Sequence, residues 1–337
     1  MRRKYEVKRG MIKRDFYLNR LISSMWNGEV KVITGIRRCG KSVLLFDLFY
    51  EYLLSTGVAD DQIIKLALDQ RRSYRYRNPI TLCDYVEAIV KDQSDREFYL
   101  FIDEVQLTTT FVDREHGGAV VTIYDMLNDL KTYKNLDVYV TGSNSRGLSS
   151  DIATEFRGRA TQIHIYPFSF AEFYSVVGGD ERTAFDRYAL YGGMPRILYL
   201  DNEQDKKEYL SSLYQELYIK DIVERNGIER QDILNNILDF LASQIGSLTN
   251  PTNIANALSN TNREKINPVL VSNYIQHIVD SFLVSVAKRY DVKGKKYFKY
   301  PNKYYYTDIG LRNARLNYRQ YDPGHIMENI IYNELIR

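Results

Sequence analysis

Residues 35–42 have the types and the spacing of a phosphate-binding loop. They spell Gly-Ile-Arg-Arg-Cys-Gly-Lys-Ser, which fits G-x-x-x-x-G-K-S, and they join an apolar segment to an amphipathic one. The two glycines let the backbone curl so that successive N–H groups face inward, and the following helix starts with its positive dipole end at the same point. Lys41 is expected to reach the β- and γ-phosphates of a nucleotide, and the Ser42 hydroxyl to ligate Mg²⁺. The nucleotide contacts that we expect from this loop are Gly35, Arg37, Arg38, Cys39, Gly40, Lys41, Ser42 and Val43.

Two adjacent carboxylates, Asp103 and Glu104, end the apolar run 98–102. A run that is apolar on both faces is typical of a central parallel strand, and ligands of open α/β sheets bind at the carboxyl ends of such strands. Phosphate hydrolysis needs one acid to hold Mg²⁺ and another to polarise the attacking water. We assign the metal role to Asp103 and the base role to Glu104. The alternative is a strand that merely ends in acidic turn residues, and the preceding loop makes it the weaker interpretation.

Two further residues are candidates for contact with the γ-phosphate. Asn144 follows the apolar segment 136–141 and is expected to sense the γ-phosphate or to orient the water, with Ser143 as the second choice and an ordinary polar turn as the alternative. Arg159 is preferred over Arg157 for stabilising the charge that develops on the γ-phosphate, within one chain or across a subunit interface. A surface ion pair is the competing interpretation for either arginine.

The elements that must position these residues alternate between strands and helices. Hydrophobic spacing predicts strands at 30–33, 63–68, 98–102, 136–141 and 161–165, and helices at 12–25, 43–54, 82–90, 120–130 and 170–177. We expect an N-terminal basic helical segment (1–28), an α/β P-loop NTPase domain with a parallel sheet (29–190), a helical lid or connector (191–230), an α+β winged-helix domain (231–303) and the start of a further domain (304–337).

Composition limits the class of protein. The 337 residues are 44% hydrophobic, which suffices for two or three domains with cores of their own, and the net charge of +3 does not dictate a nucleic-acid partner. Cys39 and Cys83 form neither a disulfide framework nor a zinc pattern. No apolar run approaches the roughly 18 residues of a membrane helix, and the basic N-terminus is not followed by an apolar signal core. We therefore expect a cytoplasmic protein that does not enter the membrane.

The second half predicts a winged helix. Three short helical patterns precede two alternating segments, 283–290 and 296–300, and the helix at 267–281 would be the recognition helix. Lys293, Lys295 and Lys296 lie among aromatic residues in the predicted wing, a pattern suited to phosphate contacts. Nucleic acid and a protein partner both remain open as occupants of this wing.

Several blocks together resemble the P-loop AAA-type ATPases of bacteria and archaea that carry a C-terminal domain of unknown function. The matching blocks are the loop at 35–42, Phe-Ile-Asp-Glu-Val-Gln at 101–106, Thr-Gly-Ser-Asn-Ser at 141–145, the run from 156 to 173, and Tyr-Gly-Gly-Met-Pro at 191–195. The resemblance implies a five-stranded core of the additional-strand type, with ATP and Mg²⁺ as ligands. Asn144 departs from the serine that many relatives carry, and this departure weakens its assignment as a sensor.

The resemblance extends to the C-terminal residues. It places Glu328 in the first helix of a restriction-endonuclease-like module whose remaining acids lie further along the chain, so we expect no cleavage activity from these 337 residues. The function we predict is a Mg²⁺-dependent ATPase switch, slow or partner-stimulated, coupled to the winged helix. The alternatives are a DNA-binding regulator whose nucleotide site is mainly structural and a nucleotide-dependent nuclease in a longer chain. A homo-oligomer is left open.

Overall fold

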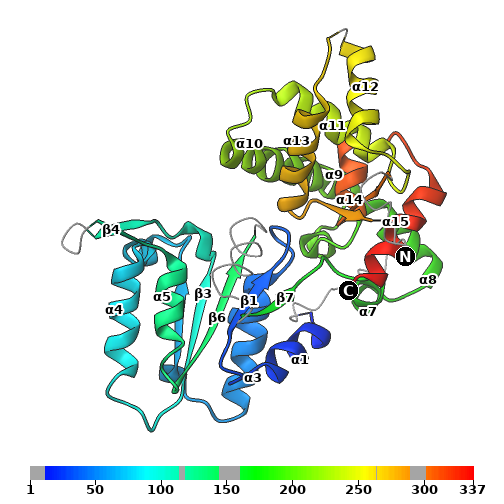
Figure 1. Cartoon of the computed structure of the whole chain (residues 1–337). Helices are drawn as coiled ribbons and strands as arrows, with labels where there is room; N and C mark the ends of the chain where they lie inside the picture. Colours follow the sequence, from blue (N-terminus) through cyan, green and yellow to red (C-terminus); the bar gives the residue numbers. More distant parts are fainter. Residues whose placement is uncertain (1–11, 114–117, 144–159, 263, 289–300) are drawn as a thin grey trace, which may run out of the picture. The chain divides into compact units, whose positions relative to one another are not determined.

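The computed structural model describes residues 12–113, 118–143, 160–262, 264–288 and 301–337 (Figure 1). The chain divides into two compact units. Of the described residues, those within 12–35 and 40–165 form the sheet unit, and those within 36–39 and 166–337 form the C-terminal unit. Among the described residues, none of the helices is long and apolar enough to cross a membrane.

Five parallel strands form the sheet of the first unit. Their order is β2-β3-β6-β1-β7, and their bounds are Val30–Thr34 (β1), Ile63–Ala67 (β2), Phe98–Asp103 (β3), Leu136–Gly142 (β6) and Ala160–His164 (β7). Strand β6 lies between β1 and β3, and β1, β3 and β6 are buried along their whole length. Residues in such central strands need apolar side chains on both faces, which explains the unbroken apolar run 98–102 of β3, whereas β1 and β6 each contain one buried charged residue, Lys31 and Asp137. The predicted five-stranded parallel core is confirmed.

Helices cover both faces of this sheet. Helices α4 (Pro79–Val90) and α5 (Ile123–Leu130) pack on the face that carries Leu100. On the opposite face, Phe49 contacts Phe101 and Tyr139. Phe49 belongs to the continuous helical segment that follows the loop, made of α2 (Lys41–Val43), η1 (Leu44–Phe49) and α3 (Tyr50–Ser55), and α1 (Asp15–Ser23) packs against η1.

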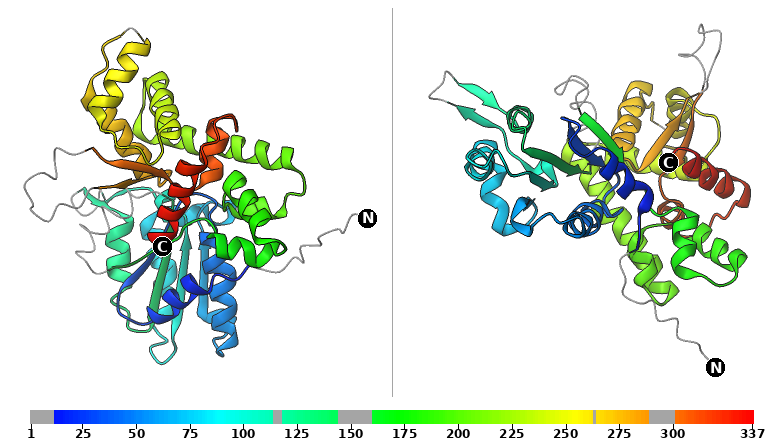
Figure 2. Two further views of the ribbon diagram at one scale, coloured as in Figure 1. Left: turned by 90° about the vertical axis from the view of Figure 1, so that its right-hand side faces the viewer. Right: turned by 90° about the horizontal axis from the view of Figure 1, so that it is seen from below.

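An antiparallel hairpin of β4 (Phe111–Asp113) and β5 (Ala119–Val121) was not predicted. The hairpin projects from the sheet unit beside the ends of α4 and α5 (Figures 1 and 2). The helix expected over 120–130 therefore begins only at Ile123, because the β-branched residues before it enter the hairpin and Thr122 caps the helix.

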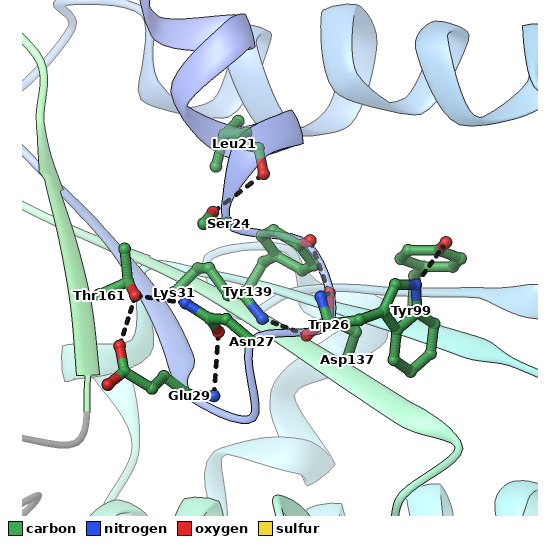
Figure 3. Close-up of polar contacts among 10 residues, drawn as sticks. All are labelled: Leu21, Ser24, Trp26, Asn27, Glu29, Lys31, Tyr99, Asp137, Tyr139 and Thr161. Atoms are coloured by element: carbon green, nitrogen blue, oxygen red, sulfur yellow. Dashed lines mark hydrogen bonds and ion pairs between the residues drawn. The ribbon is translucent and has the colours of Figure 1, made fainter.

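A buried charge pair holds the amino end of the sheet together (Figure 3). Lys31 of β1 forms an ion pair with Asp137 of β6, and both side chains are almost fully buried. The Tyr139 hydroxyl (2.7 Å) and the Trp26 backbone N–H (3.0 Å) also donate to the Asp137 carboxylate. Burial lowers the pKa of Lys31, and the neighbouring Asp137 opposes that shift. The pair lies at the opposite edge of the sheet from the predicted nucleotide loop, so it serves the fold.

The C-terminal unit is mostly helical. Its elements are α7 (Phe170–Val177), α8 (Glu181–Tyr191), η5 (Pro195–Tyr199), α9 (Glu203–Ser212), η6 (Leu213–Ile219), α10 (Lys220–Asn226), α11 (Gln231–Ser243), α12 (Pro251–Asn262), α13 (Pro268–Asp280), β8 (Val284–Ala287), β9 (Lys303–Tyr306), α14 (Ile309–Arg315) and α15 (Pro323–Leu335). We expected the ATPase domain to reach residue 190, but the sheet unit ends at Ile165, because α8 packs against α7 and α14 within the C-terminal unit.

Helices α11 to α13 precede an antiparallel pair, β8 and β9, in the order expected for a winged helix. The partner of β8 is residues 303–306, later than the segment 296–300 that we expected, which lies outside the described residues together with Lys293, Lys295 and Lys296. The expected boundary at residue 303 therefore divides a strand pair. Asn329 of α15 also hydrogen-bonds the backbone of Tyr306 in both directions, at 2.8 Å each. Residues 304–337 thus belong to the same unit as the residues before them.

Candidate functional site

The loop after β1 adopts a curled backbone. Arg38 and Gly40 have φ angles of +62° and +104°, and at Gly40 a side chain would be strained. Lys41 opens α2 and is buried, and its ammonium donates to the Gly35 carbonyl at 3.0 Å. The ammonium thus lies against the first residue of the loop. This geometry fits a nucleotide phosphate.

Ser42 and Asp103 meet across the sheet edge. The Ser42 hydroxyl donates to the Asp103 carboxylate at 2.7 Å, and the Thr141 hydroxyl donates to the other Asp103 oxygen. Burial raises the pKa of Asp103, whereas the hydrogen bonds from Thr141 and Ser42 lower it. A hydroxyl beside a carboxylate is an oxygen ligand set of the kind that Mg²⁺ takes together with phosphate oxygens and water.

Glu104 is held in an uncommon backbone conformation. Its φ of +55° lies in the left-handed region, and its N–H donates to the Thr141 hydroxyl at 3.1 Å. The side-chain amide of Gln106 and the Ser143 hydroxyl both donate to the Glu104 carboxylate, the latter at 3.3 Å. A strained conformation of this kind persists only where surrounding bonds support it, and here the hydrogen bonds with Thr141, Gln106 and Ser143 provide that support.

The predicted sensor and arginine positions are only partly described. Ser143, the second choice, is buried and touches Glu104. Asn144, Arg157 and Arg159 lie outside the described residues. Sequence reasoning missed Thr141 and Gln106, although a polar residue at the end of a buried strand and the Gln beside Asp-Glu were visible signals.

The middle of the loop groups with the C-terminal unit. The Arg37 guanidinium pairs with Asp221 at 2.7 Å, the Arg37 carbonyl accepts a hydrogen bond from Tyr218 at 2.8 Å, and Arg225 also pairs with Asp221 at 2.8 Å. Arg37 was predicted to contact the nucleotide, and in this structure its charge is engaged by a carboxylate of α10. Arg38 is exposed and Cys39 is buried.

The sequence did not indicate His164, at the end of β7, as a residue of the site. Its ring nitrogen Nδ1 lies 3.0 Å from the Thr34 hydroxyl, at the last residue of β1. Burial, then the positive charges of Lys41 and Arg20, lower the pKa of His164 to about 4. A neutral imidazole therefore borders the loop near neutral pH and adds no positive charge there.

Comparison with known proteins agrees with the fold. Residues 27–174 match the family model of an AAA domain, and residues 182–322 match a domain of unknown function (DUF8612). An uncharacterized protein of Haemophilus influenzae is 33% identical over 338 residues, which cover 98% of this chain and 80% of that protein. An uncharacterized protein of Methanocaldococcus jannaschii is 28% identical over 328 residues, covering 92% and 67%. A Walker-type ATPase of Pyrococcus abyssi shares the fold, with a TM-score of 0.60, 18% identity and coverage of 91% of this chain and 96% of that one.

Proposed function

Because this chain belongs to the AAA-type P-loop ATPases, a family that binds ATP, we propose that it hydrolyses ATP in the presence of Mg²⁺ and uses the cycle as a switch. The observation that carries the proposal is the hydrogen bond between Ser42 and Asp103, with Glu104 directly after Asp103. These groups lie at the carboxyl ends of the parallel strands, where the loop that follows β1 also begins. The groups that we propose for binding and for hydrolysis thus share one edge of the sheet.

Each residue has a distinct role in the proposal. The backbone N–H groups of the loop and the Lys41 ammonium bind the β- and γ-phosphates. Ser42 and Asp103 would hold Mg²⁺, which when bound would neutralise charge on the phosphate oxygens. Glu104 accepts the proton of the attacking water, and the amide of Gln106 and the hydroxyl of Ser143 orient its carboxylate. Asn144 as sensor and Arg159 as charge stabiliser remain part of the proposal.

We propose that the C-terminal unit carries out the task that the ATP cycle controls. Arg37, in the middle of the nucleotide loop, is bound by Tyr218 and Asp221, so a nucleotide that displaces the loop would act on these two residues. The predicted winged helix of α11 to α13 and β8–β9 would then engage nucleic acid, through Lys293, Lys295 and Lys296, or a protein partner.

The test compares ATP binding and ATP turnover in matched variants. Lys41→Ala should abolish binding, whereas Glu104→Gln should bind ATP and turn it over at least about 100-fold more slowly. Lys91→Ala and Glu97→Gln are the controls, because both are exposed residues at the amino edge of the same sheet. Unchanged turnover in Glu104→Gln would show that the base lies elsewhere. Tight ATP binding with negligible turnover by the wild type, with and without DNA, would favour a mainly structural nucleotide site.

A further inference from the structure

The segment that joins β2 to α4 is strongly basic. It forms the 3-10 helix η3 (Arg71–Arg77) with the sequence Arg-Arg-Ser-Tyr-Arg-Tyr-Arg, which has four arginines and no acidic residue. Arg71, Arg72 and Arg75 are exposed, while Ser73 and Tyr76 are buried. The helix therefore faces outward with its arginines and is anchored by its two buried residues.

Several contacts fix η3 in place. The Tyr76 ring lies 4.7 Å from the Tyr85 ring of α4. The Arg77 guanidinium donates to the Leu68 carbonyl at 2.8 Å, and the Arg77 carbonyl accepts a hydrogen bond from the Thr109 N–H at 2.8 Å. A surface that is already ordered loses little conformational entropy when it binds a partner.

The outermost arginines lack the carboxylate partners that other surface arginines of this protein have. Arg96 and Arg230 each pair with aspartate, whereas no carboxylate of the described residues lies within ion-pair distance of Arg71 or Arg72. The Arg75 guanidinium lies over the Tyr76 ring, 4.6 Å from its centroid. Exposed guanidinium groups without carboxylate partners are the groups that bind phosphate diesters in pairs of parallel hydrogen bonds.

An aromatic ring stands among these arginines. Tyr74 is 51% exposed, and the Arg77 guanidinium lies 4.1 Å from the centroid of its ring. Arg77 thus supports the Tyr74 ring and leaves about half of that residue open to solvent. An exposed ring held among cationic groups is the arrangement that stacks an unpaired base while arginines bind the adjoining phosphates.

We propose that η3 binds single-stranded nucleic acid, with Arg71, Arg72 and Arg75 on phosphates and Tyr74 stacked on a base. A single strand is favoured over a duplex because only unpaired bases offer a face to Tyr74. This assignment differs from the predicted wing, whose segments 283–290 and 296–300 and whose lysines Lys293, Lys295 and Lys296 are far from η3 in sequence.

The surface lies close to the proposed hydrolytic acids. Strand β2 ends with Ala67 opposite Asp103, and the Leu68 N–H donates to the Asp103 carbonyl at 3.2 Å. The bond from Thr109 ties the other end of η3 to the segment that follows Glu104. Backbone hydrogen bonds thus connect the segments at the two ends of η3 to Asp103 and to the residues after Glu104. Nucleic acid bound to η3 would therefore alter ATP turnover. This coupling rests on the proposed function, whereas binding itself does not.

The test measures the anisotropy of a fluorescent single-stranded oligonucleotide titrated with the full chain at several salt concentrations. Arg71→Ala/Arg72→Ala should weaken binding about tenfold and lower the salt dependence by about 0.7 per lost phosphate contact. Tyr74→Ala should also weaken binding about tenfold, with an unchanged salt dependence. Lys91→Ala/Lys134→Ala removes the same charge from exposed positions at the amino edge of the same sheet and should bind like the wild type.

The outcomes separate this inference from the ATPase proposal. Binding that is unaffected by the η3 variants overturns the inference, and so does equal affinity for duplex, or competition by poly-glutamate at matched charge. The last result would identify η3 as a docking site for acidic proteins. Lys41→Ala should bind the oligonucleotide normally while losing ATP, so a failure of nucleotide binding leaves this test intact. If the oligonucleotide binds through η3, ATP turnover should change on its addition in the wild type and not in Arg71→Ala/Arg72→Ala.

Discussion

The Ser42 hydroxyl donates a 2.7 Å hydrogen bond to the Asp103 carboxylate, although 61 positions separate the two residues in sequence. The bond forms because β1 and β3 end at the same edge of a parallel sheet, and Ser42 lies in the segment that follows β1. These two oxygens would hold Mg²⁺ in the proposed site, and the bond between them keeps them adjacent. The arrangement makes magnesium dependence the first property to test.

Removing either ligand should reduce the Mg²⁺-dependent turnover of ATP without destabilising the fold. We expect Ser42→Ala and Asp103→Asn to lower kcat about 100-fold, since ligation of the metal supplies several kcal/mol of stabilisation to the transition state. Ser42→Thr keeps the hydroxyl and should retain turnover. The measurement is ATP turnover across a series of Mg²⁺ concentrations, and a Ser42→Ala protein with the wild-type magnesium profile would contradict the assignment.

The ion pair between Arg37 and Asp221 restrains a charge of the nucleotide loop. Asp221→Asn should free the Arg37 guanidinium and lower the Kd for ATP about threefold, because a partly exposed pair of this kind is worth up to about 1 kcal/mol. The gain should shrink in high salt as the charges are screened. Kd is measured by titration with a fluorescent ATP analogue. Asp239→Asn is the control, because Asp239 pairs with Arg315 and not with a loop arginine. A Kd unchanged by Asp221→Asn would remove Asp221 from the proposed switch.

The parts of this site that sequence predicted are those carried by contiguous residues. The residue types at 35–42 by themselves predict a curled loop. Those at 98–103 predict a buried strand that ends in carboxylates at the sheet edge. Five strands were therefore found in the right places. Local patterns of this kind need no information about the rest of the chain.

The missed features depend on contacts between distant residues. Thr141 matters only because β6 lies beside β3, and Asp221 only because α10 reaches Arg37. The hairpin of β4 and β5 was missed because each strand has just three residues, too few to show a period. Strand β9 was missed for a related reason, since it is identified as a strand by its pairing with β8.

The buried pair of Lys31 and Asp137 should be required for stability. Asp137→Ala leaves the Lys31 ammonium buried without its partner, which costs about 3–5 kcal/mol, whereas Lys31→Met/Asp137→Leu should recover much of the loss. Urea unfolding of each variant gives these free energies. Asp61→Ala breaks an exposed pair with Arg96 and should change the unfolding midpoint little. An Asp137→Ala protein as stable as the wild type would mean that water reaches Lys31.

Asp308 joins two parts of the C-terminal unit. Its carboxylate accepts hydrogen bonds from the N–H groups of Gly193 (2.7 Å) and Leu311 (3.1 Å). A Cβ on Gly192 would lie 2.2 Å from this carboxylate, so the backbone can approach only because residue 192 is glycine. Burial raises the pKa of Asp308 to about 6, and the N–H groups of Gly193 and Leu311 oppose the shift.

The raised pKa of Asp308 sets the sign of a pH dependence. The folded state binds this proton more tightly than the unfolded chain, whose aspartate keeps its ordinary pKa of 3.8. The resulting stabilisation is complete below pH 3.8 and is lost as pH rises through about 6. From this group alone, the free energy of unfolding should fall by about 1 kcal/mol between about pH 5 and pH 7. Asp308→Asn should remove that fall, as measured by urea unfolding at both pH values. Asp180→Asn is the control, because hydrogen bonds from Thr183 lower the pKa of exposed Asp180 and it titrates below this range. A slope that persists in Asp308→Asn would assign it to another group.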